Sequence, residues 1–243
     1  MAEGLLWLLV VVLSMGFVPQ DDFSACKSEL KRYVDELAKI NAPTGKRVYH
    51  MRMTVKTDMS SRSTMPDSET HVEVFMSEHQ LHYVSDVLST YQDEQDAFAV
   101  LPQRKTIVWS RGGKRPDADS KKALAAHIQD TLVTVSKITR CGPVVEQGTP
   151  YKQITMIPYK KAIETFRVNR MEYFIDSEKK RIGKVTTFYQ PGEEIITQSV
   201  TYHELDLNYT GVSLQKPVRD QIVTSSGKLL SRYKGYQLID NRN

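Results

Sequence analysis

The chain has only two cysteines among its 243 residues, and neither belongs to a Cys-x-x-Cys pair or has an adjacent histidine. We therefore predict that neither is catalytic, since nothing beside them would stabilise a thiolate. The sequence also lacks a metalloprotease helix motif, a nucleophile elbow and a glycine-rich phosphate loop. These absences argue against an enzyme, and no cofactor or metal is expected.

Clusters of one charge are also missing. The formal net charge is +4, but basic pairs such as Lys31-Arg32 and Lys160-Lys161 are scattered and mixed with acidic residues. A nucleic-acid surface needs basic residues gathered with stacking aromatic side chains. Nucleic acid is therefore not expected as a partner, and the charges are better interpreted as solvated surface.

Only one apolar run stands out, and it is short. Residues 5–13 are unbroken apolar sequence, which is too short to span a bilayer as a helix. Ser14 and Gly16 follow at the spacing of a signal-peptidase site, which predicts a signal peptide over residues 1–16 and one domain over residues 17–243. The alternative is a short buried helix or an uncleaved anchor. With the signal peptide removed, the protein is expected to be exported and periplasmic.

Export permits a disulfide between Cys26 and Cys141, with two separate buried thiols as an equal alternative. Cys26 lies on the first predicted helix and Cys141 lies just past the second, so if both helices cover the same face of a sheet the bond would hold the first helix in that layer. Cys26 also ends the sequence Phe23-Ser24-Ala25-Cys26, which is similar to a lipobox. Lipidation of Cys26, giving a lipid-anchored envelope protein, is the third alternative.

Residues 71–110 carry the clearest pattern in the chain. The first run places Val72, Val74 and Met76 on one face of a strand, and later short runs contain Tyr83 and Phe98. About five such runs with polar breaks between them predict an antiparallel meander. Several runs are apolar on both faces, so each face should be covered or should line a cavity.

Helices and strands alternate through the rest of the chain. Apolar stripes at three- and four-residue spacing predict helices over residues 22–40 and 120–139. Strands are predicted over residues 47–57, 144–145, 152–158, 167–175, 182–189, 195–207 and 229–238. This order predicts an α+β fold with one large, strongly curved antiparallel sheet, an incomplete barrel, and amphipathic helices packed on its concave face.

This layout resembles the bacterial outer-membrane lipoprotein carriers, the LolA/LolB-like proteins. The shared pattern comprises the signal peptide, the first helix, a strand at residues 49–55, the segments 72–83 and 91–102, and late strands within residues 171–206. The carriers place a basic residue and often a proline where this chain has Ser77 and Glu78, which leaves the cargo open.

The resemblance implies an apolar cavity between sheet and helices that takes acyl chains. Candidate lining residues are apolar members of the meander: Val74, Met76, Leu81, Tyr83, Phe98, Val100 and Trp109. The simpler alternative is that these residues fill a closed core.

Two groups of polar residues have functional alternatives of their own. His79 and His82 would form a metal site only if a turn brought them together, because positions i and i+3 of a strand face opposite ways. Asp93, Glu94 and Asp96 are candidate paired carboxylates. Solvated turn and strand residues are the favoured interpretation of both groups.

The sequence therefore predicts an exported periplasmic protein that binds an apolar or acylated ligand. Its expected partner is a lipid or an acylated protein, with membrane proteins of the envelope as further candidates. The alternative is a non-catalytic accessory protein of the cell envelope that acts through protein–protein contacts.

Overall fold

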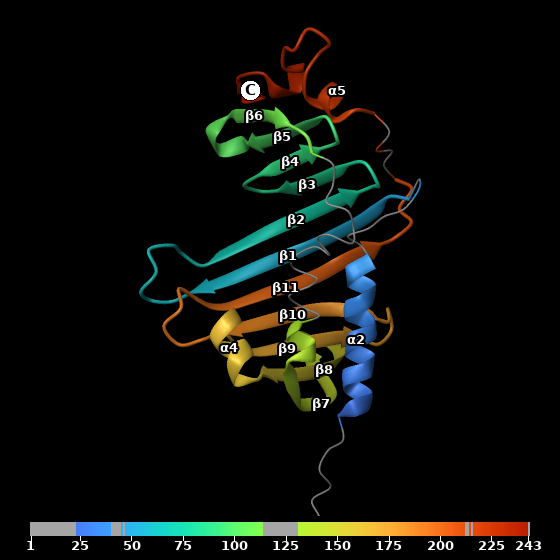
Figure 1. Cartoon of the computed structure of the whole chain (residues 1–243), viewed down its shortest axis with the longest axis vertical. Helices are drawn as coiled ribbons and strands as arrows, with labels where there is room; N and C mark the ends of the chain where they lie inside the picture. Colours follow the sequence, from blue (N-terminus) through green and yellow to red (C-terminus); the bar gives the residue numbers. More distant parts are fainter. Residues whose placement is uncertain are drawn as a thin grey trace, which may run out of the picture.

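The computed structural model describes residues 23–39, 45, 47–113, 131–211, 214 and 216–242. The predicted signal peptide and residues 120–130 of the predicted second helix lie outside these ranges. The described residues form a 12-stranded sheet in the order β12-β6-β5-β4-β3-β2-β1-β11-β10-β9-β8-β7 (Figure 1). The strands pair antiparallel, except that β12 runs parallel to β6. The predicted α+β fold with one large, curved, incompletely closed sheet is confirmed.

The strands and helices have the following bounds. The strands are β1 (Tyr49–Met59), β2 (Ser68–Met76), β3 (Leu81–Ser85), β4 (Ser89–Gln92), β5 (Asp96–Leu101), β6 (Thr106–Arg111), β7 (Ser136–Glu146), β8 (Thr149–Pro158), β9 (Val168–Asp176), β10 (Arg181–Tyr189), β11 (Ile195–Asp206) and β12 (Gln237–Asp240). The α-helices are α2 (Ser24–Lys39), α4 (Lys160–Phe166) and α5 (Val218–Ile222), and two short 3-10 helices span Pro102–Arg104 and Ser231–Tyr233.

The strand register divides the side chains of the sheet between two faces. Directly opposed residues of paired strands share a face, and neighbours along a strand alternate. Met51 is opposed to Val74 and to Leu205, and we call the face that carries these residues the inner face. His50 is opposed to Phe75, and their face is the outer face.

Helix α2 packs on the inner face of the β8–β10 part of the sheet (Figure 1). Leu30, Tyr33 and Val34 recur at three- and four-residue spacing and are at most 4% exposed. They contact a cluster that includes Ile154 and Tyr173, which are opposed across β8 and β9. The apolar stripe seen in the sequence is therefore the face by which the helix is held.

A second core lies on the outer face, at the other end of the sheet. Phe98 and Trp109 are opposed across β5 and β6 and are 0% and 2% exposed. Val218 and Ile222 of α5 pack against them and are fully buried. The two helices thus cover opposite faces of one sheet.

The predicted second helix ends earlier than expected. Residues 131–134 are helical, but strand β7 begins at Ser136, so Ile138 and Cys141 lie on a strand. The segment also alternates, and its pairing with β8 prevails over the helical spacing. Gly142 and Pro143 also lie within β7, where a proline is tolerated because β7 is an edge strand.

The C-terminal strand is also shorter than predicted. Leu229 forms only an isolated bridge with Val223, and the strand itself is Gln237–Asp240. Helices α4 and α5 were not predicted, because seven and five residues are too few to establish a period.

Candidate ligand-binding surface

The centre of the inner face carries an apolar surface built on β1, β2, β3 and β11. Strand β1 lies near the middle of the sheet order, between β2 and β11. Its alternation directs Met51 and Met53 to the inner face, where Met53 is opposed to Val72 and Tyr202. We call the following cluster the central inner patch: Tyr49, Met51, Met53, Val55, Val72, Val74, Met76, Leu81, Tyr83, Leu205 and Leu207.

Burial within the central inner patch is incomplete. Tyr49, Val72, Val74 and Met76 are between 3% and 9% exposed, whereas the other members, such as Met53, are only partly buried. By contrast, Tyr173 under α2 is 0% exposed. Most members of the patch therefore keep accessible apolar surface, whereas most members of the α2 core are buried.

Charge is segregated between the two faces. Among the described strand residues that the register places on the inner face, only Lys152 is charged, and it forms an ion pair with Glu29 of α2. The outer face carries the other charged strand residues: Arg52, Lys56, Asp58, Glu69, Glu73, Asp96, Arg111, Lys137, Arg140, Glu146, Arg170, Glu172, Asp176, Arg181, Lys184, Glu204, Asp206 and Asp240. The inner face is consequently suited to apolar contact, and the part of the outer face that lies beyond the α5 core is suited to water.

Directly behind the central inner patch, the outer face is polar. His50 is 3% exposed and lies between two carboxylates, with Nε2 at 2.9 Å from Glu73 and Nδ1 at 3.4 Å from Glu204. Its ring stacks on Phe75 at 4.6 Å between centroids and contacts Tyr209 at 4.5 Å. These contacts hold the outer-face side chains of β1 in place, while its inner-face side chains form part of the central inner patch.

The structure separates the seven predicted lining residues into two groups. Val74, Met76, Leu81 and Tyr83 lie together in the central inner patch. Phe98, Val100 and Trp109 lie on the outer face and are enclosed by the α5 core. The second group therefore does not border the central inner patch.

The predicted acidic cluster has structural partners. Asp93 accepts hydrogen bonds from the backbone N–H groups of Gln95 and Asp96 on one oxygen and of Val218 on the other, at 2.8 to 2.9 Å. Asp96 accepts the indole N–H of Trp109 at 2.6 Å. These bonds hold the β4–β5 turn and α5 in place.

The two histidines that were considered as metal ligands have different surroundings. His79 is exposed and lies 3.4 Å from Glu94, whereas His82 is 7% exposed on the outer face beside the ring of Tyr91. Burial lowers the pKa of His82 to about 4, and the charge of Asp93 opposes this effect in part. Within the described residues, no group of three or more metal-ligating side chains is arranged to hold a metal ion.

Sequence reasoning missed the part of the patch that β1 and β11 contribute. Met51, Met53 and Val55 alternate within the strand that the sequence predicts, so their common face was visible. Their place beside Val74 and Leu205 depends on pairing between residues that are 23 or more positions apart. Alternation alone does not identify that partner strand.

Comparison with known proteins finds similar solved structures at low sequence identity. No family model and no curated protein matches the sequence. Similar solved structures include the lipoprotein LppX from Mycobacterium tuberculosis, with a TM-score of 0.47 and 12% identity over 76% of this chain and 97% of that one. An uncharacterised conserved protein from Thermus thermophilus gives a TM-score of 0.41 and 11% identity, covering 90% of this chain and 100% of that one.

A LolA superfamily protein from Nitrosomonas europaea also matches, with a TM-score of 0.27 and 8% identity over 74% of this chain and 94% of that one. That protein belongs to the superfamily that the sequence pattern of this chain resembles. At these identities the likeness concerns the fold alone.

In the described residues, no helix is both long and apolar enough to cross a bilayer.

Proposed function

We propose that this protein is an exported binding protein that holds an apolar chain, such as the acyl chain of a lipid or of an acylated protein, on the central inner patch. The observation that carries the proposal is the accessible, uncharged apolar surface at the centre of a sheet whose charges face the other way. Burial of each methylene group of a ligand there contributes about 0.8 kcal/mol.

The side chains of the patch suit ligands of varied shape. Met51 and Met53 project from adjacent inner positions of β1, and Met76 lies at the end of β2. Methionine is unbranched and polarizable, so it adapts to irregular apolar partners. Tyr83 adds a ring with a polar end at the edge of the same surface. A site of this kind favours an acyl chain over a rigid substrate.

The disulfide supports the export of the protein. Cys26 of α2 is bonded to Cys141 of β7, and such bonds persist in oxidising compartments outside the cytosol. The same bond occupies the sulfur of Cys26 that lipid attachment would need. We infer a periplasmic protein that acts by binding rather than by catalysis, with its carboxylates Asp93 and Asp96 committed to the fold.

Solvent extraction and probe titration test the proposal. The purified protein is extracted with organic solvent for mass spectrometry and is then titrated with the apolar fluorophore N-phenyl-naphthylamine. Bound lipid, or saturable fluorescence that fatty acyl compounds displace, is the expected result. A protein without lipid that binds no probe, and that copurifies with a large envelope complex, would instead act through protein contacts.

A further inference from the structure

The central inner patch ends, at one end of its strands, in a row of uncharged polar side chains. Thr57 of β1 is opposed to Ser68 of β2 and to Gln198 of β11, and Gln198 is opposed to Thr187 of β10. We call these four residues the polar row. Ser68 is exposed and the other three are partly buried, so all four have accessible surface on the inner face.

On β1, β10 and β11 the next inner residue after the polar row is apolar, whereas β2 has one further polar residue, Thr70. The next inner residue of β1 is Val55, which is opposed to Thr70 and to Val200. Beyond it come Met53 and Met51, which lead to Tyr49 at the start of β1. From Thr57 to Tyr49 the strand extends about 26 Å at about 3.3 Å per residue, a length suited to a fatty acyl chain.

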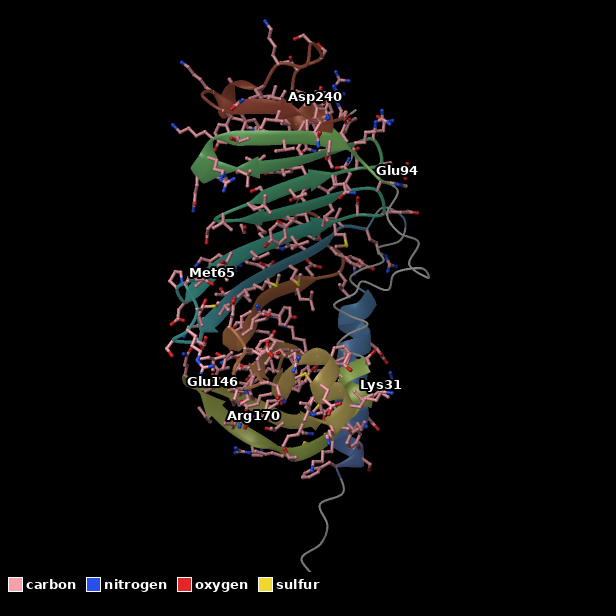
Figure 2. All side chains as sticks on the ribbon, turned by 60° about the vertical axis from the view of Figure 1, so that its left-hand side comes forward. Lys31, Met65, Glu94, Glu146, Arg170 and Asp240 are labelled. Carbon is pink, nitrogen blue, oxygen red and sulfur yellow. A yellow bond between two sulfur atoms is a disulfide. The ribbon has the colours of Figure 1, made fainter. Side chains whose placement is uncertain are left out.

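The polar row lies at the accessible end of this surface. Strand β1 ends at Met59, two residues beyond Thr57, and the loop that follows contains Met65, which Figure 2 labels at that end of the sheet. Ser68 and Thr57 therefore border the loop between β1 and β2. A ligand whose chain lies on the patch would place its polar end here.

The groups in the polar row can donate and accept hydrogen bonds but carry no charge. The amide of Gln198 donates to the hydroxyl of Thr57 at 3.4 Å. A threonine hydroxyl has one hydrogen and two lone pairs, and a glutamine amide has two hydrogens and a carbonyl oxygen. Most of this capacity is left for a ligand. Beside Thr57, the charged residues Lys56 and Asp58 lie on the outer face, in an ion pair at 3.3 Å. Beside Ser68, Glu69 also lies on the outer face, and Asp67 in the preceding loop accepts a hydrogen bond from the backbone N–H of Met59.

We propose that the polar row binds the uncharged head of the ligand, an ester, hydroxyl or amide group, while the apolar chain lies along the central inner patch toward Tyr49. This inference rests on the proposed function. An ester or amide oxygen finds donors in Gln198, Thr57 and Thr187. A phosphate or free carboxylate would meet only neutral groups in this row and would be bound less well, because burial of an unpaired charge is unfavourable.

Competition between matched ligands tests the inference. N-phenyl-naphthylamine is bound first, and it is then displaced by compounds with the same twelve-carbon chain and different heads: monododecanoyl glycerol, dodecanoyl glycinamide, dodecanoate and dodecyl phosphate. The two neutral compounds are expected to displace the probe at concentrations about tenfold lower than the two anions, as one or two additional hydrogen bonds would give. The glycerol and glycinamide arms also separate a lipid ester from an acylated peptide as the natural source.

Two variants then locate the preference. Thr57→Val combined with Gln198→Leu should remove the preference for neutral heads, so that all four compounds displace the probe at similar concentrations. Thr201→Val is the matched control. Thr201 lies on β11, as Gln198 does, but on the outer face, where it is opposed to Thr54 and Lys184. Failure of the probe to bind would overturn the proposed function itself. Three other results would overturn the role of the polar row and leave the proposed function standing. They are equal displacement of the probe by all four compounds, stronger displacement by the anions, and an undiminished preference for neutral heads in the double variant.

Discussion

Cys26 and Cys141 are bonded across the inner face with their Cα atoms 6.5 Å apart, although they are separated by 115 positions in the sequence. Cys26 lies in the first turn of α2, and Cys141 lies in the middle of β7, the edge strand. The bond therefore fixes the beginning of α2 to the edge of the sheet, and the rest of the helix is held by packing of Leu30, Tyr33 and Val34.

Replacement of both cysteines by serine should lower the free energy of unfolding by about 2–5 kcal/mol, since the bond closes a long loop in the unfolded chain. Urea denaturation of the oxidised protein and of the Cys26→Ser, Cys141→Ser variant measures the difference. The wild-type protein in a reductant should behave like the variant. Alkylation of two free thiols in the unreduced, exported protein would contradict the bond.

A charge placed on the central inner patch should weaken the binding of an apolar probe. Met53→Lys introduces an ammonium group among Val72 and Tyr202, and a charge is disfavoured beside a bound apolar chain. The affinity for N-phenyl-naphthylamine is expected to fall by about tenfold or more, equivalent to about 1.4 kcal/mol. Thr201→Lys on the outer face should bind the probe as the wild type does, and circular dichroism would establish that both variants are folded.

Truncation of Phe98 should affect stability and not binding. Phe98 is 0% exposed between Trp109 and α5, so Phe98→Ala should cost about 3–5 kcal/mol of unfolding free energy. Phe98→Leu is a milder replacement for binding measurements if the alanine variant does not fold. Unchanged affinity for the probe is expected. A large loss of affinity in the folded leucine variant would instead place Phe98 at the ligand site.

Acidification should destabilise the protein through His82. Its pKa lies at about 4 in the fold, against an ordinary value of 6.5, because burial disfavours the charged ring. As the pH falls, His82 is therefore protonated in the unfolded chain at a higher pH than in the folded protein. The contribution of neutral His82 to the free energy of unfolding is complete above about pH 6.5 and is lost as the pH falls toward about 4.

The loss attributable to His82 is on the order of 3 kcal/mol, from about 1.4 kcal/mol for each unit of pKa difference. The difference between the unfolding free energies at neutral pH and at about pH 4 measures this loss. His82→Gln should remove this part of the pH dependence and leave the part that arises from other groups. An identical pH dependence in the variant would show that His82 does not contribute.

Local patterns predicted the elements better than their arrangement. The stripe through Leu30 and Val34 predicted α2, and the alternation from Tyr49 predicted β1, because each pattern depends on neighbours in the sequence. The face that a strand presents depends instead on the number of residues in each turn. Val74 and Phe98 belong to similar alternating runs, yet pairing through β3 and β4 places them on opposite faces.

Long-range pairing accounts for what remained unpredicted. Strand β12 adds to β6 in parallel, with Leu238 opposed to Ile107 across more than a hundred residues of chain. The pairing of β1 with β11 similarly brings Leu205 to Met51 and completes the central inner patch. A single sequence contains no local signal for either contact, so the inner patch was predicted only in the part that β2 and β3 supply.

The α2 core and the α5 core contain different residues and lie on opposite faces at opposite ends of the sheet. Each core holds one end of the sheet, and β1, β2 and β11 connect the two ends through long ladders. An amide in such a ladder exchanges its hydrogen only when the bonds on that side of the strand open. The central strands are therefore expected to exchange their amide hydrogens slowly even without a ligand, so that the proposed site has a firm backbone and adapts to a ligand through its side chains.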